Sequence, residues 1–152
     1  MNIPVKKLCK NAMIPTSGSE DAAGFDLYAA GDKEHIWIKE HGSAMIPTGL
    51  SMEIPKGYFG AIFARSGLAS KQGLRPANCV GVVDPDYRGE IMVALHNDRN
   101  GDKCIHVGDR IAQLVIIPYM NITFEETDEL HDTERGSGGF GSTGIGALEE
   151  SH

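Results

Sequence analysis

Short apolar runs, broken at close intervals by proline and glycine, constrain the fold of this chain more than any other feature of its sequence. Four such runs follow one another, at residues 36–38, 44–46, 50–54 and 58–63. Strands of this length and spacing are typical of a sandwich or jelly roll, whereas βαβ units need helical segments between the strands. No stretch of about 18 residues shows competing helical periodicity. The sequence therefore predicts an all-β fold, a distorted jelly roll or β-sandwich.

The size of the chain limits the number of domains. Its 152 residues, 41% of them hydrophobic, are enough for one domain with a sizeable core and too few for two ordinary ones. Neither a basic leader followed by an apolar segment nor a long uncharged apolar run is visible. We therefore expect a soluble, cytoplasmic protein that does not interact with membranes.

Charge and cysteine content exclude several classes of function. A net charge of −7 disfavours general binding to nucleic acid, which needs a basic surface to displace counterions. Cys9, Cys79 and Cys104 are odd in number, widely spaced and without a CxxC pair, which argues against a disulfide framework or a thiolate zinc site. We expect reduced thiols, and any anionic ligand must be held by local positive groups or by a metal ion.

Residues 65–73 interrupt the strands with good helix formers. Ser66 occupies a plausible N-cap position and Gly73 a plausible position just past the last turn, which predicts one or two turns of helix. Because a helix start exposes unpaired N–H groups, Ser66 and Gly67 beside Arg65 are a potential phosphate cradle. A capped connector helix without a ligand is the alternative interpretation.

Residues 81–89 begin with the end of one apolar run, at residues 78–83, and continue with Asp, Pro and Gly up to a second run, at residues 90–95. This pattern predicts a β-hairpin whose arms are those two runs. The tip carries two carboxylates, among them Asp84, together with the ring of Tyr87 and a guanidinium, more polar chemistry than a turn needs. An ordinary solvated turn is the alternative.

Two further polar residues lie in apolar surroundings. Asp26 stands between Phe25 and Leu27, and on local grounds we expect its carboxylate to cap a turn by accepting from nearby backbone N–H groups. Gln113 is the one polar residue in a long apolar run, so its amide must find partners, and we expect these to be neighbouring backbone groups.

The C-terminal segment differs in composition from the rest. Residues 125–134 are acidic, and residues 135–144 are glycine-rich with one arginine, one phenylalanine and two hydroxyl side chains. Such a segment in isolation cannot bury enough apolar surface to offset its ordering entropy. We predict a β domain at residues 1–134 and a mobile tail at residues 135–152. A terminus without a role is one interpretation, and a tail that wraps phosphates and stacks on a base is the other.

Five stretches, taken in order, resemble the five motifs of the trimeric dUTP pyrophosphatases (dUTPases). They are residues 22–27, 65–69, 81–89, 108–114 and 135–144. The resemblance implies a jelly-roll fold, a homotrimer with shared active sites, and Mg²⁺-dependent hydrolysis of dUTP to dUMP and pyrophosphate. Such a reaction limits uracil incorporation into DNA and supplies dUMP for thymidylate synthesis.

The resemblance also implies catalytic roles. Asp84 matches the catalytic aspartate, and a carboxylate of ordinary acidity is ionised near neutral pH and able to accept a proton from the attacking water. Gln113 and Ser66 would contact the phosphates near the scissile bond, with Arg65 and the Gly67 amide adding positive potential. Asp26 would support this network. The Mg²⁺ would be held by phosphate oxygens and waters, so no cluster of protein ligands is expected.

Substrate binding is implied for two further groups of residues. Asn78 and the backbone up to Val83 would face the uracil edge without room for thymine's methyl group, and Tyr87 under the deoxyribose would exclude a 2′-hydroxyl. In the tail, the implied contacts are Arg135, Phe140, Gly141, Ser142 and Thr143, with Phe140 stacking on the base and the others near the γ-phosphate or lining the lid.

Two other functions share part of this pattern. A dCTP deaminase has the same fold and trimer, but it usually has Phe where Tyr87 stands, and its activating glutamate lies in a sequence context that is not found here. The other is a non-catalytic protein of this fold that senses nucleotide with its tail, although every expected chemical residue is present. A P-loop is excluded because no GxxxxGK[ST] motif occurs.

Overall fold

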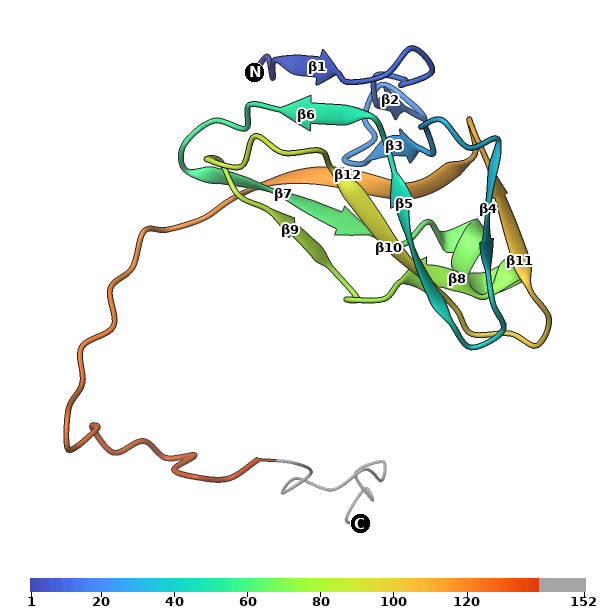
Figure 1. The fold of residues 1–152 in the computed structure, drawn as a ribbon. Coiled ribbons are helices and arrows are strands. Elements are labelled where there is room, and N and C mark those ends of the chain that lie inside the picture. The colour runs from blue at the N-terminus through green and yellow to red at the C-terminus, as the bar shows by residue number, and fades with distance from the viewer. Residues whose placement is uncertain (140–152) are drawn as a thin grey trace. The chain divides into compact units, whose positions relative to one another are not determined.

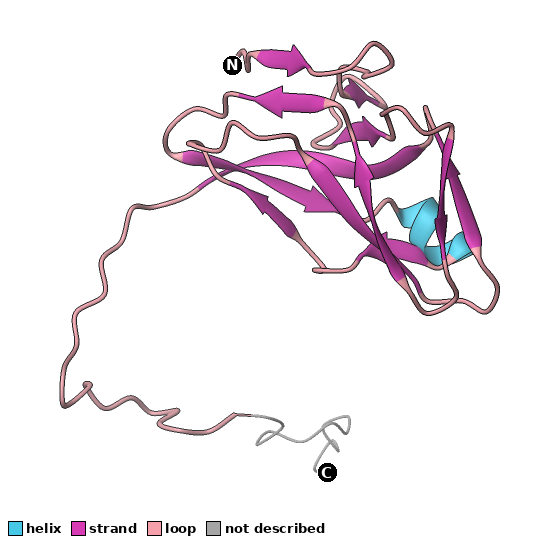
Figure 2. Ribbon diagram, in the orientation of Figure 1, coloured by secondary structure: helices cyan, strands magenta, loops and turns pink. Residues whose placement is uncertain are grey.

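The computed structural model describes residues 1–139, and within them twelve strands and one short helix are present (Figures 1 and 2). The strands are β1 (Val5–Lys7), β2 (Thr16–Ser17), β3 (Phe25–Tyr28), β4 (His35–Ile38), β5 (Ser43–Pro47), β6 (Leu50–Met52), β7 (Tyr58–Phe63), β8 (Leu74–Pro76), β9 (Gly81–Val83), β10 (Met92–Asn97), β11 (Lys103–His106) and β12 (Arg110–Pro118). The helix is η1 (Leu68–Gln72). The strands expected at residues 36–38, 44–46, 50–54 and 58–63 are confirmed as β4 to β7.

All strand pairs are antiparallel. The largest sheet has the order β2-β3-β12-β7-β9, and the next has the order β5-β10-β8. Two-stranded pairs, β11-β4 and β1-β6, complete the fold. This arrangement of short antiparallel strands in packed sheets is the predicted all-β jelly roll.

The hydrophobic core lies between the two larger sheets. Leu27 and Leu114 point inward from the five-stranded sheet, and Ile46 and Leu95 point inward from the three-stranded sheet. Each of these four side chains is at most 3% exposed. Burial of large aliphatic side chains from both layers holds the sheets face to face, at roughly 25 cal/mol per Å² of apolar surface.

The predicted hairpin is wrong. β9 lies in the five-stranded sheet beside β7, whereas β10 lies in the three-stranded sheet between β5 and β8. The segment that joins β9 to β10 crosses from one sheet to the other, and its own turn is closed by a hydrogen bond from the Tyr87 amide to the Asp84 carbonyl oxygen (3.2 Å). Alternating apolar residues identify both strands, but the alternation carries no information about which strand each one pairs with.

The short helix is confirmed, and its expected cap is not. The N-cap position belongs to Gly67, and no side-chain hydrogen bond caps the helix. The carbonyl oxygen of Ser66 instead accepts a hydrogen bond from Ser70 Oγ (2.7 Å). At the other end Gly73 adopts φ 69°, the left-handed conformation that glycine reaches without a Cβ clash, as predicted.

The chain divides into two units, Met1–Asn121 and Ile122–His152. In the second unit, residues 122–139 form neither strand nor helix. The division into residues 1–134 and 135–152 stays a prediction. No helix among residues 1–139 has the length and apolar character needed to cross a membrane.

Candidate active site

One group of charged residues lies at the end of the five-stranded sheet. Strand β12 places Gln113 between Asp26 of β3 and Phe63 of β7, so these residues form one row across the sheet. The chain continues past Phe63 to Arg65, whose Nε donates a hydrogen bond of 2.6 Å to Asp26 Oδ1. Arg110 Nη1 lies 3.3 Å from Asp26 Oδ2. We call Asp26, Arg65 and Arg110 the arginine cluster.

The expectation that Asp26 caps a turn is wrong. Asp26 lies within strand β3, its side chain is only 15% exposed, and its two oxygens accept from two guanidinium groups. A carboxylate with so little exposure needs such partners, because an unpaired buried charge is strongly unfavourable. Sequence reasoning missed Arg110 as a site residue, although it lies within the matching stretch at residues 108–114.

Gln113 bonds to the backbone, as expected. Its Nε2 donates to the carbonyl oxygen of Ala64 (2.8 Å), the residue directly before Arg65. On the other side of the amide, a Cβ added at Gly24 would lie 2.6 Å from Gln113 Oε1. A side chain at residue 24 would therefore force Gln113 to shift, and glycine leaves room for the rotamer that bonds to Ala64.

Ser66 and Gly67 follow Arg65 directly and are exposed. Nothing lies within 4 Å of a Cβ added at Gly67, so the backbone there is open to a ligand. The structure thus brings together Asp26, Arg65, Ser66, Gly67 and Gln113 at one end of the sheet.

A second group of predicted residues surrounds a cavity of about 280 Å³ beside β9. The lining includes Asn78, Val83, Asp84 and Tyr87, four residues selected from the sequence. The remaining lining residues are Met45, Ile62, Gly81, Val82, Glu90, Ile91 and Met92. We call this cavity the Tyr87 pocket. It combines an apolar floor with a few polar groups, the usual composition of a small-molecule site.

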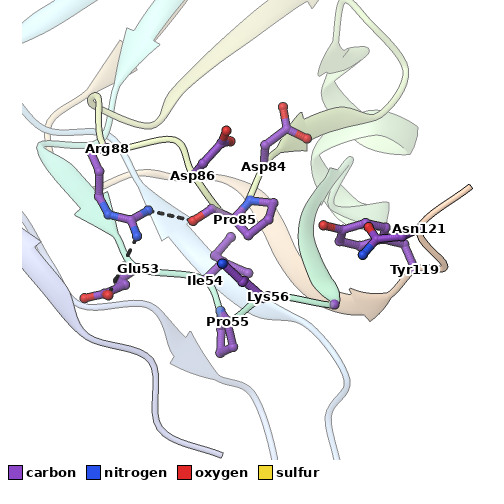
Figure 3. A pocket seen from close by; sticks show the side chains of 11 residues that line it. Glu53, Ile54, Pro55, Lys56, Asp84, Pro85, Asp86, Arg88, Tyr119 and Asn121 are labelled. Carbon is purple, nitrogen blue, oxygen red and sulfur yellow. Dashed lines mark hydrogen bonds and ion pairs between the residues drawn. The ribbon is translucent and has the colours of Figure 1, made fainter. Parts of the chain in front are cut away.

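A larger cavity, of about 730 Å³, is also lined by the loop that carries Asp84, including Pro85, Asp86 and Arg88 (Figure 3). Arg88 crosses it, with Nη1 donating to the Pro85 carbonyl oxygen (2.7 Å) and Nη2 3.7 Å from Glu53 Oε1. The carboxylate of Asp84 points away from these groups in Figure 3. We therefore assign the chemistry of Asp84 to the Tyr87 pocket rather than to this larger cavity.

Asp84 and the arginine cluster lie at different levels along β7. Val83, next to Asp84, pairs with Gly60 near the start of β7, while Gln113 pairs with Phe63 at its end. Three residues along a strand span about 10 Å, and the three strand spacings from β9 to β3 add about 14 Å at right angles. Within one chain Asp84 and Asp26 are therefore on the order of 15–20 Å apart, although the Tyr87 pocket itself reaches Ile62, the neighbour of Phe63.

The tail residues are described only in part. Arg135 Nε donates to the carbonyl oxygen of Gly138 (2.8 Å) within a turn. The other predicted tail contacts, Phe140, Gly141, Ser142 and Thr143, lie outside the described residues.

An all-β sandwich with a paired-arginine cluster and a separate small pocket defines a protein suited to binding a phosphorylated small molecule. The dUTPase family model matches residues 10–144. The chain is 44% identical over 145 residues to the deoxyuridine 5'-triphosphate nucleotidohydrolase of Syntrophotalea carbinolica, which covers 95% of this chain and 98% of that protein. The chain therefore belongs to the dUTPase family.

Solved structures agree with this assignment. The dUTPase of Staphylococcus bacteriophage 80alpha with dUPNHPP superposes with a TM-score of 0.86 at 30% identity, covering 95% of this chain and 99% of that one. A mutant dUTPase from phage phi11 of S. aureus, described with a structural Mg(II) ion, superposes with a TM-score of 0.76 at 26% identity, covering 85% and 98%.

Proposed function

We propose that this chain hydrolyses dUTP to dUMP and pyrophosphate through in-line attack on the α-phosphorus by a water that Asp84 activates. The observation that carries the proposal is the Tyr87 pocket, which gathers Asn78, Val83 and Tyr87 around one cavity with Asp84 in its wall. The reaction limits uracil incorporation into DNA and supplies dUMP for thymidylate synthesis.

Asp84 is suited to act as the general base. Its side chain is exposed, and among residues 1–139 no hydrogen bond or ion pair occupies its carboxylate oxygens. The carboxylate is therefore available to hold a water and accept its proton, a role that contributes about 10²–10⁴-fold in rate.

The arginine cluster and its neighbours are suited to bind the triphosphate. Arg65 uses only Nε on Asp26 at short range, which leaves most of its N–H groups for phosphate oxygens. Gln113 has a second Nε2 hydrogen beyond the one given to Ala64. With Ser66 and Gly67 exposed beside them, these groups stabilise the charge that moves to the leaving pyrophosphate.

Selectivity for deoxyuridine is assigned to the Tyr87 pocket. The backbone of β9 forms one wall, and a Cβ added at Gly81 would lie 3.1 Å from Ile62 Cβ, so this wall is already closely packed. Uracil is selected by polar pairing with Asn78 and the β9 backbone, and Tyr87 excludes a ribose 2′-hydroxyl by contact.

We further propose that the working enzyme is a homotrimer in which each site is completed by neighbouring chains. The separation of Asp84 from Asp26 supports this, because a scissile phosphate held beside Asp84 would lie far from the arginine pair at Asp26 in the same chain. In a closed ring, each chain offers its pocket to one neighbour and its arginine cluster to the other. The tail, with Arg135, Phe140, Gly141, Ser142 and Thr143, is proposed to close over a neighbour's site.

Mg²⁺ is the proposed cofactor. Among residues 1–139 no group of three His, Cys, Asp or Glu side chains is placed to hold a metal ion, and both oxygens of Asp26 already face guanidinium groups. An ion held by phosphate oxygens and waters fits this open, cationic surface without a cage of protein ligands. When bound, it neutralises charge on the phosphate oxygens.

The cellular setting is proposed to be the cytoplasm. Cys9, Cys79 and Cys104 are free thiols in the structure, as expected in a reducing compartment.

The test is a nucleotide-hydrolysis assay on the purified protein with Mg²⁺. We expect dUMP and pyrophosphate from dUTP, and far slower reaction of dCTP, dTTP and UTP. Release of ammonia from dCTP, or a rate on UTP comparable to that on dUTP, would overturn the proposal.

A further inference from the structure

Strand β12 contains one extra residue where it runs along β3. Gln113 pairs with Asp26 and Ala112 with Leu27, but Arg110 pairs with Tyr28, so Ile111 has no partner of its own. This is a β-bulge, a feature that bends a strand and changes the direction in which a side chain points.

The bulge changes the face on which Arg110 lies. Side chains alternate along a regular strand, so with Gln113 on the outer face the residue three positions earlier belongs on the inner face. Ile111 and Ala112 are instead both fully buried, two successive residues facing the core, and Arg110 is exposed. The extra residue therefore brings Arg110 to the face that carries Asp26.

Arg110 supports Arg65 in two ways. Its side chain binds Asp26 Oδ2 (3.3 Å), the oxygen opposite the one that Arg65 Nε occupies. Its carbonyl oxygen lies 3.5 Å from Arg65 Nη1. Asp26 and Arg65 are largely covered, with side chains 15% and 25% exposed, so this contact pattern restricts their orientation.

Arg110 also sets the charge of the cluster. Asp26 and Arg65 alone form a neutral pair, and the second guanidinium gives the group of three a net charge of +1. A carboxylate next to a phosphate-binding arginine reduces the attraction between that arginine and an anionic ligand. A second cation beside the carboxylate offsets this effect.

We propose that Arg110 is a positioning residue for triphosphate binding, which offsets the charge of Asp26 and keeps Arg65 oriented toward the phosphates. This inference rests on the proposed role of Arg65. It assigns the bulge at Ile111 a function in the site rather than in the fold alone.

The test uses binding of the non-hydrolysable dUPNHPP and of dUMP, measured by calorimetry without Mg²⁺. Arg110→Gln is expected to weaken dUPNHPP binding about tenfold, with a smaller effect on dUMP, because the loss is one of net charge facing several phosphates. Lys39→Gln is the matched control, since it removes a surface cation that pairs with Asp102 (2.7 Å) outside the site.

A second substitution separates charge from architecture. Arg110→Gln with Asp26→Asn restores the net charge of +1, so we expect it to recover part of the affinity that Arg110→Gln loses. If Arg110 serves only the fold, the double variant binds no better than the single one, and that result overturns the inference. Unchanged dUPNHPP affinity in Arg110→Gln overturns it as well.

The wild-type protein in the same experiment keeps the two proposals apart. Hydrolysis of dUTP by wild type together with no effect at Arg110 rejects only the positioning role. Failure of wild type to hydrolyse dUTP rejects the proposed function, and the positioning role of Arg110 is then rejected as well.

Discussion

Tyr87 Oη donates a hydrogen bond of 2.9 Å to the carbonyl oxygen of Glu90, three residues further along the chain. This bond folds the ring back over Gly89, where a Cβ would lie 2.6 Å from the ring carbon that carries the hydroxyl. The position of the ring in the pocket therefore depends on a glycine that itself does not line the cavity.

Gly89→Ala is expected to displace the Tyr87 ring and relax discrimination against UTP. We expect the ratio of kcat/KM for UTP over dUTP to rise roughly tenfold, the size of one lost steric contact in a substrate pocket. Tyr87→Ala should act in the same direction. Gly18→Ala is the control, because nothing lies within 4 Å of a Cβ there. If the kcat/KM ratio is unchanged in both Gly89→Ala and Tyr87→Ala, Tyr87 does not select against UTP.

Asp84→Asn keeps the shape of the side chain and removes the base. Turnover of dUTP should fall at least roughly 10²-fold, the lower end of general-base contributions, while dUTP binding persists. Calorimetric titration beside a turnover assay checks both. A variant that binds dUTP more weakly but turns over bound dUTP at the wild-type rate would contradict the catalytic role.

Gly24→Ala is expected to disturb Gln113 by direct contact. The new methyl group would meet Gln113 Oε1 at 2.6 Å, so the amide must rotate and give up its hydrogen bond to Ala64. We expect dUTP turnover to fall by about tenfold or more with little change in the melting temperature. The reason is that the Gln113 amide would no longer stabilise the transition state, which lowers the rate. A variant with full activity would show that Gln113 does not need this rotamer.

A mixed assembly tests whether sites are shared. Asp84→Ala with an intact tail, and a chain that ends at Glu134 with Asp84 intact, should each be inactive alone. Refolded together, a ring of three containing both chains places one intact Asp84 beneath a donated tail, so about a third of wild-type activity per hybrid is expected. Verified hybrids without recovery would mean that the tail acts on its own chain.

Acid conditions should weaken the ion pair between Lys39 and Asp102. The hydrogen bond from Lys39, with another from the Glu40 amide, lowers the pKa of Asp102. A carboxyl whose pKa is lower in the folded state stabilises the fold above its unfolded pKa, about 3.9, and loses that effect as the pH falls through the folded value. Asp102→Asn should therefore lower the melting temperature at pH 7 and make little difference at pH 2. An equal effect at both values would contradict the linkage.

The sequence was informative about elements and less so about their partners. Short runs with proline and glycine between them identified β4 to β7, and Gly73 marked the end of η1. The pairing of β9 was predicted wrongly, since the apolar alternation in β9 and β10 is the same whether they pair with each other or with other strands.

Site residues show the same limit. The five stretches located Asp26, Arg65 and Gln113. The role of Asp26, whose carboxylate is shared by two arginines, could not be predicted because it depends on a bulge in β12. The bulge buries two successive apolar residues, Ile111 and Ala112, and within a nearly continuous apolar run the sequence does not show where the extra residue lies.

The separation of Asp84 from the arginine cluster has a consequence for how activity depends on enzyme concentration. If each site is shared between chains as proposed, a solitary chain carries Asp84 and the arginine cluster too far apart to act on one substrate. Under the proposed assembly, specific activity depends on mass action among chains, so progressive dilution should lower the activity per chain.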